Sequence, residues 1–180
     1  MTNKFPLGTR TADDITSEMI RVNHAGEYGA RQIYRGQLAV LGNDDCASTL
    51  QHMVQQEEAH LQSFEEYMRA RHVRPSALLP FWHVAGYALG AATALMGKRT
   101  AMACTVAVET VISEHYQQQI EQLGDAEPQL KKSIAMFRDE ELEHHDIGID
   151  QEAEKAPFYE VFSGAIRAGC RTAIWLAKRI

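Results

Sequence analysis

The segment Glu57-Glu58-Ala59-His60 is the strongest indication of the fold of this chain. Its Glu-x-x-His motif is repeated at Glu141-Leu142-Glu143-His144. Each copy follows a single glutamate, Glu27 or Glu109, by about thirty residues. A glutamate and a histidine three positions apart lie on one face of a helix, so each copy can present a carboxylate and an imidazole to the same point. The doubled pattern therefore predicts four helices that direct four carboxylates and two imidazoles to one centre.

Such a ligand set is typical of ferritin-like di-iron and di-manganese carboxylate bundles. Helical periodicity fills the rest of the chain, and hairpin signals between alternating strands are almost absent. We predict helices over roughly 13–41, 44–72 and 128–156, one that carries Cys104 to Ile120 and ends near residue 124, and a last one over 158–180. The first helix is expected to be capped within residues 11–17, with Glu18 as capping partner. The last helix is expected to gather apolar residues on one side: Phe158, Phe162, Ala165, Ala173, Leu176 and Ile180.

The predicted fold class is all-α: a ferritin-like four-helix bundle with two additional apolar or amphipathic helices. Its 180 residues are expected to form a single di-iron domain over 1–180, with a flexible N-terminus over 1–12. The charge of −6, from 24 acidic and 18 basic residues, argues against a nucleic-acid partner. Three widely spaced cysteines and the lack of an apolar run in residues 1–10 predict a reducing compartment without export, hence a cytoplasmic protein.

The register of the second motif is open on spacing alone. Glu140 with His144, or Glu141 with His145, could also share a helix face. Aligning the two halves favours Glu141 with His144, which leaves Glu58, Glu140, Glu143 and His145 as outer or surface groups. An isolated Glu-x-x-His is usually a solvated surface, but Glu109 stands in an apolar run, where a buried charge needs a partner such as a metal. Iron and manganese both accept these ligands.

Residues 77–97 contain no Asp, Glu, Lys or Arg. Together with the apolar run up to Val108, they could form a buried pair of core helices, or a transmembrane span of the required length of about 20 residues. Pro80 and the Ala and Gly content weaken the second reading. A third reading places helices on one leaflet of a membrane, assisted by Trp82, Trp175 and a basic face from Arg167 to Lys178.

Four segments resemble the 5-demethoxyubiquinone hydroxylase family of ubiquinone biosynthesis: residues 22–30, 57–61, 104–109 and 137–148. The resemblance implies a ferritin-like bundle with two Fe ions that uses O2 to hydroxylate the ring of a polyprenylated demethoxyubiquinone precursor. It also implies peripheral attachment to the cytoplasmic face of the cell membrane. The metal ligands that it implies are Glu27, Glu57, His60, Glu109, Glu141 and His144, the six that spacing predicts. His115 and Tyr116, which follow Glu109, are candidates for an electron or proton relay, or for simple packing.

The expected partners are a polyprenyl quinone, O2, a membrane surface and other ubiquinone-biosynthesis proteins, with no nucleic acid. The tail of the quinone is expected to lie between residues 77–108 and the last helix. Two alternatives belong to other classes of protein. One is a ferritin-like or rubrerythrin-like ferroxidase or iron-handling protein with the same six ligands, and the other is a quinone-lipid-binding protein without catalytic activity. The uncharged stretch favours the hydroxylase, since iron storage needs a polar entry route.

Overall fold

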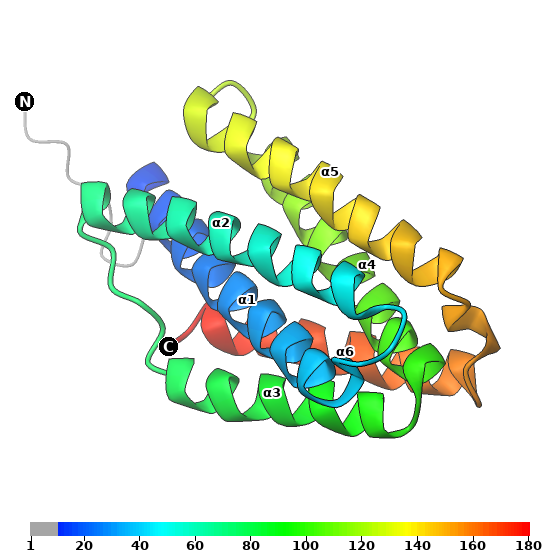
Figure 1. Cartoon of the computed structure of the whole chain (residues 1–180). Coiled ribbons are helices and arrows are strands. Elements are labelled where there is room, and N and C mark those ends of the chain that lie inside the picture. The colour runs from blue at the N-terminus through cyan, green and yellow to red at the C-terminus, as the bar shows by residue number, and fades with distance from the viewer. Residues whose placement is uncertain (1–10) are drawn as a thin grey trace, which may run out of the picture.

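The structure, a computed structural model, describes residues 11–180, and within that range it consists of helices and the turns between them (Figure 1). The elements are α1 (Ala12–Leu41), α2 (Ala47–Arg71), α3 (Leu79–Leu95), α4 (Lys98–Leu123), α5 (Pro128–Asp150), the short 3-10 helix η1 (Ala153–Lys155) and α6 (Tyr159–Ala177). The predicted all-α class is confirmed. Of the N-terminus predicted to be flexible, residues 1–10 lie outside the described range.

The ends of the helices follow local side-chain chemistry. Thr11 caps α1: its hydroxyl accepts from the backbone N–H of Asp14 at 3.1 Å, and the Asp14 carboxylate accepts from the Thr11 N–H at 2.9 Å. The prediction of Glu18 as the capping partner is wrong, because Asp14 occupies the third helical position. Pro128 stands in the first turn of α5, where its missing N–H costs no hydrogen bond. The predicted fifth helix is shorter than expected, since α5 stops at Asp150 and η1 follows.

Two helical hairpins, α1 with α2 and α4 with α5, form the four-helix bundle (Figure 1). One apolar cluster, with Phe64, Tyr116 and Phe137, fills the end of the bundle where α1 begins. A second cluster, with Tyr34, Leu50 and Met102, fills the other end. The middle of the bundle, between the two clusters, is left for the polar residues of the predicted site.

The remaining helices cover one side of the bundle, α3 chiefly against α1 and α6 chiefly against α4. Glycines allow α3 to approach α1 unusually closely. A Cβ atom on Gly90 would collide with the carbonyl oxygen of Ile33, and one on Gly36 with that of Tyr87. The C-terminal half of α3 is therefore held directly on the backbone of α1.

The apolar stretch between residues 77 and 108 divides into two different environments. Residues 100–108, at the start of α4, are buried throughout, whereas only Gly90, Thr93 and Ala94 of α3 are buried. Phe81, Val84 and Leu95 expose 57%, 67% and 76% of their surface. The reading as a pair of core helices is therefore wrong for α3. No helix in the range 11–180 combines the length and the hydropathy that crossing a membrane would need.

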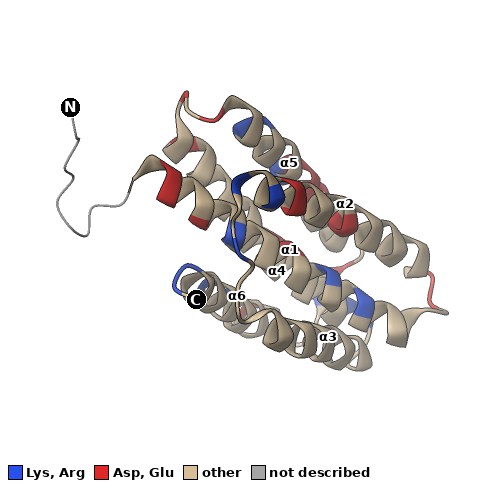
Figure 2. Cartoon of the chain, turned by 90° about the vertical axis from the view of Figure 1, so that its left-hand side faces the viewer, with Lys and Arg blue, Asp and Glu red and all other residues tan. Residues whose placement is uncertain are grey.

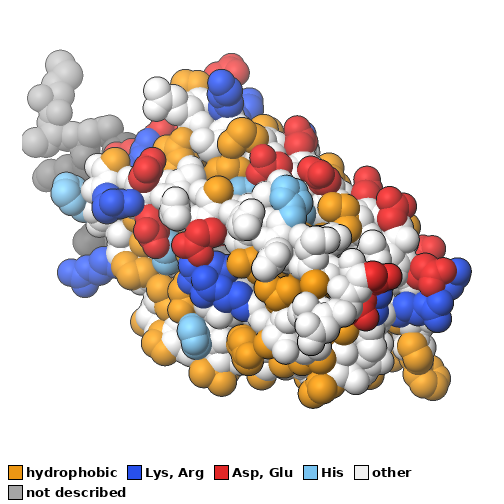
Figure 3. All heavy atoms as spheres, in the orientation of Figure 1, with side chains coloured by type: hydrophobic (Ala, Val, Ile, Leu, Met, Phe, Trp, Pro, Cys, Tyr) orange, Lys and Arg blue, Asp and Glu red, His pale blue; other side chains and the backbone are white. Residues whose placement is uncertain are grey.

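The outward sides of α3 and α6 both expose large apolar side chains, and we call these two sides together the α3/α6 face, defined by Phe81, Val84, Leu95, Val161 and Trp175. In Figure 2, α3 carries no charged residue, and α6 has basic residues near its C-terminal end. Figure 3 shows hydrophobic side chains along the lower edge of the molecule, over α3, and charged ones above. Phe158 and Ile180, placed with Phe162 and Leu176 on one side of the last helix, are 85% and 48% exposed. Of the same predicted side, Phe162 packs against apolar residues of the bundle, and Ala165 and Ala173 line a space between α6 and the bundle.

Candidate metal centre

All six predicted ligands meet in the middle of the bundle, and each side chain is buried. Their ligand atoms form two groups, within each of which the atoms lie within 4.8 Å of one another. One group contains Glu27, Glu57, His60 and Glu141, and the other contains Glu57, Glu109, Glu141 and His144. Because Glu57 and Glu141 belong to both groups, the six residues could hold two ions and would share these two carboxylates between them.

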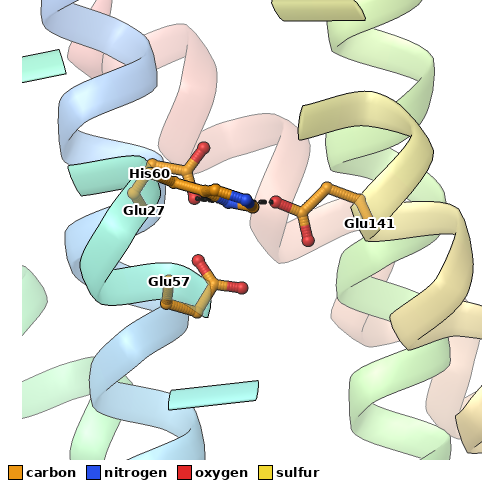
Figure 4. A group of neighbouring side chains, drawn as sticks. All are labelled: Glu27, Glu57, His60 and Glu141. Carbon is orange, nitrogen blue, oxygen red and sulfur yellow. Dashed lines mark ion pairs between the residues drawn. The ribbon is translucent and has the colours of Figure 1, made fainter. Parts of the chain in front are cut away.

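Both imidazoles direct Nδ1 toward this centre. His60 Nδ1 lies 3.1 Å from Glu141 Oε1 and 3.5 Å from Glu27 Oε2, and Figure 4 shows its ring between these two carboxylates. His144 Nδ1 lies 3.1 Å from Glu141 Oε2 and 3.5 Å from Glu57 Oε1. Each imidazole thus lies within 3.5 Å of two ligand carboxylates, and Glu141 is one of the two in both cases.

Many polar atoms in the centre have no hydrogen-bond partner within residues 11–180. They include both carboxylate oxygens of Glu27 and of Glu57, one oxygen each of Glu109 and Glu141, and His60 Nδ1. An unsatisfied buried polar group costs about 1–3 kcal/mol, and a charged one costs more. Unsatisfied atoms that converge from four helices on one point fit divalent cations, for which carboxylate and imidazole are ordinary ligands.

The electrostatics of the metal-free site follow from its burial. Burial raises the pKa of Glu27, Glu57 and Glu109, and repulsion from Glu141 adds to the effect. Burial also acts on Glu141, but the hydrogen bond with His144 and the ion pair with His60 outweigh it and lower its pKa to about 2. The same interactions overcome burial at the imidazoles and raise the pKa of His60 to about 12 and that of His144 to about 11. Protons therefore occupy ligand atoms that an ion would need.

Three further residues contact the ligands from outside. His60 Nε2 is bonded to the Glu140 carboxylate, and His144 Nε2 lies 2.9 Å from Gln56 Oε1. The Tyr34 hydroxyl donates to Glu109. The sequence predicted Glu140 as an outer group but missed Gln56 and Tyr34. Tyr34 follows Glu27 by two helical turns on the same face, so its position near the centre could have been predicted from the sequence. The spacing of Gln56 gives no such indication.

The structure also decides the register of the second motif. Glu141 and His144 are buried at the centre, whereas Glu143 is exposed and His145 pairs with Asp146 at 3.0 Å on the surface. In the first motif, Glu58 binds Arg31 at 2.6 Å, away from both ligand groups. The alternatives that paired Glu140 with His144, or Glu141 with His145, are therefore not the arrangement found.

The two candidate relay residues lie outside both ligand groups of the described chain. Tyr116 is buried in the first apolar cluster, with its ring 6.3 Å from that of Phe64. His115 Nε2 lies 2.9 Å from the amide of Gln119, which is paired with Asn23 at 2.8 Å. Burial, together with Lys178, lowers the pKa of His115 to about 4. Their role in a relay stays a prediction.

A cavity of about 360 Å³ lies between the bundle and the two covering helices. Its lining is almost wholly apolar and comes from α1, α3, α4 and α6. Gly26 and Val108, which line it, are the chain neighbours of Glu27 and Glu109. The indole Nε1 of Trp82, another lining residue, is buried without a partner in the described part of the chain. The cavity therefore lies beside the segments of α1 and α4 that carry two of the predicted ligands.

Comparison of the sequence with known proteins identifies its family. The family described as "Ubiquinone biosynthesis protein COQ7" matches residues 14–177. A Bos taurus protein named NADPH-dependent 3-demethoxyubiquinone 3-hydroxylase, mitochondrial, is 53% identical over 185 residues, which cover 98% of this chain and 85% of the relative.

More distant relatives cover nearly as much of the chain. The 3-demethoxyubiquinol 3-hydroxylase of Rhodospirillum rubrum is 48% identical over 184 residues, covering 96% of this chain and 87% of the relative. The 5-demethoxyubiquinone hydroxylase, mitochondrial, of Saccharomyces cerevisiae is 41% identical over 179 residues, covering 90% and 77%. The chain belongs to the COQ7 family of ubiquinone biosynthesis proteins.

Proposed function

We propose that the protein is a di-iron monooxygenase that hydroxylates the ring of a polyprenylated demethoxyubiquinone precursor in ubiquinone biosynthesis. The observation that carries the proposal is the position of the apolar cavity beside the segments that carry Glu27 and Glu109 of the buried six-ligand centre. The names of the bovine, Rhodospirillum and yeast relatives, each a hydroxylase of a demethoxyubiquinone or demethoxyubiquinol, support the same reaction.

The six buried ligands would hold two Fe ions, one at each ligand group, with Glu57 and Glu141 shared. Bound ferrous iron would supply two electrons, so that with two protons one oxygen atom of O2 could enter the ring and the other leave as water, and an external reductant would then return the two electrons. Carboxylates suit this task because they can bind one ion or bridge two as the oxidation state changes. The protein itself keeps bulk water away, since all six ligand side chains are buried.

The cavity suits the quinone for three reasons. Its apolar lining matches a polyprenyl chain, and its volume of about 360 Å³ falls within the usual range for small-molecule sites. Gly26 and Ala30 have small side chains or none on the cavity side of α1, next to Glu27, and so leave room for a ring to approach the centre. The free N–H of Trp82 can donate a hydrogen bond to a ring oxygen. We assign the tail of the quinone to the cavity and place the ring at its Glu27 and Glu109 side.

Peripheral attachment to the cytoplasmic face of the cell membrane is part of this proposal. The α3/α6 face exposes large apolar side chains, among them Phe81, Val84 and Trp175, and such patches mark interaction surfaces. Arg171 and Arg179 on the same side of the molecule could contact lipid headgroups. Since α3 and α6 also line the cavity, a quinone could enter from the lipid without crossing water. Other ubiquinone-biosynthesis proteins remain expected partners.

One assay tests the function against its alternatives. Purified protein loaded with Fe(II) is mixed with demethoxyubiquinone in lipid vesicles, a reductant and isotopically labelled O2. We expect one labelled oxygen atom in the hydroxylated quinone. Iron oxidation without labelled product would favour a ferroxidase, and quinone binding without any oxygen consumption would favour a lipid-binding protein. Varying the reductant between NADPH and a quinol identifies the electron donor.

A further inference from the structure

The two ion positions have the same ligands but different outer partners. In each position an imidazole offers Nδ1 to the centre and turns Nε2 outward. The outward nitrogen of His60 meets a carboxylate, Glu140, whereas that of His144 meets a neutral amide, Gln56. The two copies of the ligand motif thus have the same residue types, but the residues that contact their histidines from outside differ in charge.

The surroundings of His60 are the more negative. Glu140 places a carboxylate next to the imidazole, and its side chain is 34% exposed. Neither oxygen of Glu27, the other terminal ligand of this position, accepts a hydrogen bond from a residue outside the ligand group among residues 11–180, and the contact at 3.5 Å is with His60 Nδ1, itself a ligand. Their electron density is fully available to an ion.

The surroundings of His144 are neutral. Gln56 Oε1 lies 2.9 Å from His144 Nε2 and can accept its proton in a hydrogen bond, but it carries no net charge. The Tyr34 hydroxyl donates to Glu109, which withdraws electron density from the terminal carboxylate of this position. Because of both outer contacts, the ligands at the His144 position donate less electron density to a metal ion than those at the His60 position.

We propose that Glu140 and Gln56 are positioning residues that hold both imidazoles with Nδ1 inward and make the two positions unequal, the Glu27/His60 position binding its ion first and more tightly. Hydrogen bonding of the outer ring N–H to a carboxylate raises the donor strength of the ligating nitrogen, and loss of such a partner typically changes metal affinity by about 10–100-fold. The inference rests on the metal centre of the proposed function but not on its quinone chemistry.

The test is a Co(II) titration of the metal-free protein, followed by visible absorption and by the shifted ring N–H signals in NMR. His60→Gln and His144→Gln variants assign those signals. We expect two binding steps, with the His60 signal appearing first. Glu140→Gln should weaken the first step by about 10–100-fold, and Gln56→Glu should strengthen the second by a similar factor. The double variant, which keeps the total charge, should reverse the order.

Two exposed residues on the same helices provide matched controls, because Glu143→Gln and Gln55→Glu make the same chemical changes away from the rings. Two equal binding steps in the unaltered protein, or shifts in Glu140→Gln no larger than in Glu143→Gln, would overturn the inference while leaving the metal centre intact. Failure to bind any Co(II) or Fe(II) would instead overturn the metal centre of the proposed function. Circular dichroism of each variant checks that the helices are retained.

Discussion

Glu57 of α2 and Glu141 of α5 reach the centre from different hairpins, and each belongs to both ligand groups. The other four ligands each belong to one group only. The six residues should therefore differ in their importance for metal binding, because removing a shared carboxylate affects two ion positions at once.

Loss of Glu57 and loss of Glu27 should therefore differ in metal content. We expect Glu57→Ala to retain almost no iron, because both positions lose a ligand, and Glu27→Ala to retain about one ion per chain, since the Glu109/His144 group stays complete. Elemental analysis of protein loaded with Fe(II) under anaerobic conditions measures this difference. Equal losses in the two variants would contradict the sharing of Glu57.

Metal binding should release protons. In the metal-free protein, burial raises the pKa of Glu57 and Glu109, and hydrogen bonds to carboxylates raise that of His60 to about 12 and that of His144 to about 11. The two imidazoles hold protons at pH 7 and must lose them to bind an ion. Affinity should thus rise with pH across the neutral range. Calorimetry in two buffers with different ionisation enthalpies should show a net release of protons on binding, and a heat that does not depend on the buffer would refute this.

Filling the cavity should block the quinone and spare the metal. Gly169 lines the cavity, and a Cβ atom on it meets nothing within 4 Å, so Gly169→Leu can be accommodated without moving the backbone. We expect at least a tenfold loss in hydroxylation with unchanged iron content. Gly164→Leu is the matched control, since it lies on the same helix, has equal space around its Cβ and is absent from the cavity lining. Similar activity in both variants would exclude the cavity as the quinone site.

Trp82→Phe tests the proposed hydrogen bond to the ring. The change keeps an aromatic side chain but removes the unpartnered Nε1 donor. Loss of one hydrogen bond is worth about 0.5–1.5 kcal/mol, so we expect the KM for the quinone to rise roughly three- to tenfold. Trp175→Phe serves as control, because Trp175 is 53% exposed and its ring lies under Arg179. An unchanged KM in Trp82→Phe would show that this N–H does not contact the substrate.

Vesicle binding should depend on the α3/α6 face. A charge at Val84, which is 67% exposed, would have to be desolvated in the lipid, so Val84→Asp should reduce co-sedimentation with phospholipid vesicles severalfold. Met136 on α5 is 52% exposed and lies outside this face, so Met136→Asp should bind vesicles normally. If both variants bind as the unaltered protein does, the membrane contact lies elsewhere.

The sequence predicted the centre better than its surroundings, for a physical reason. Helical periodicity alone puts Glu141 and His144 on one face, so spacing was enough to place the six residues together. Gln56 meets His144 across 88 residues of sequence, a contact set by how the two hairpins pack. The orientation of α3 could not be predicted either, because a helix without charged residues has no polar side that would indicate which side faces solvent. The close approach of Gly90 to the backbone of α1 determines that orientation in the structure.

The last helix shows the same limit. Phe158 was grouped with Phe162 and Leu176 by hydrophobicity, yet it precedes α6 in a left-handed conformation at φ 54° and is 85% exposed. Phe162 does pack against the bundle, and Ile166 and Ile174 line the cavity. Phe158 differs because it stands before the first turn of α6, where the spacing of a regular helix no longer says which way a side chain faces.

The shared carboxylates have one more consequence, which concerns how long the protein lasts in a cell. The ligands come from both hairpins, so ions bound between them would act as a cross-link inside the bundle, and their binding free energy would add to its resistance to unfolding. Without ions, unsatisfied buried carboxylates remain at the junction. A cell short of iron would then hold this chain in the form that proteases attack most readily, and its abundance would follow the iron supply with no separate regulator.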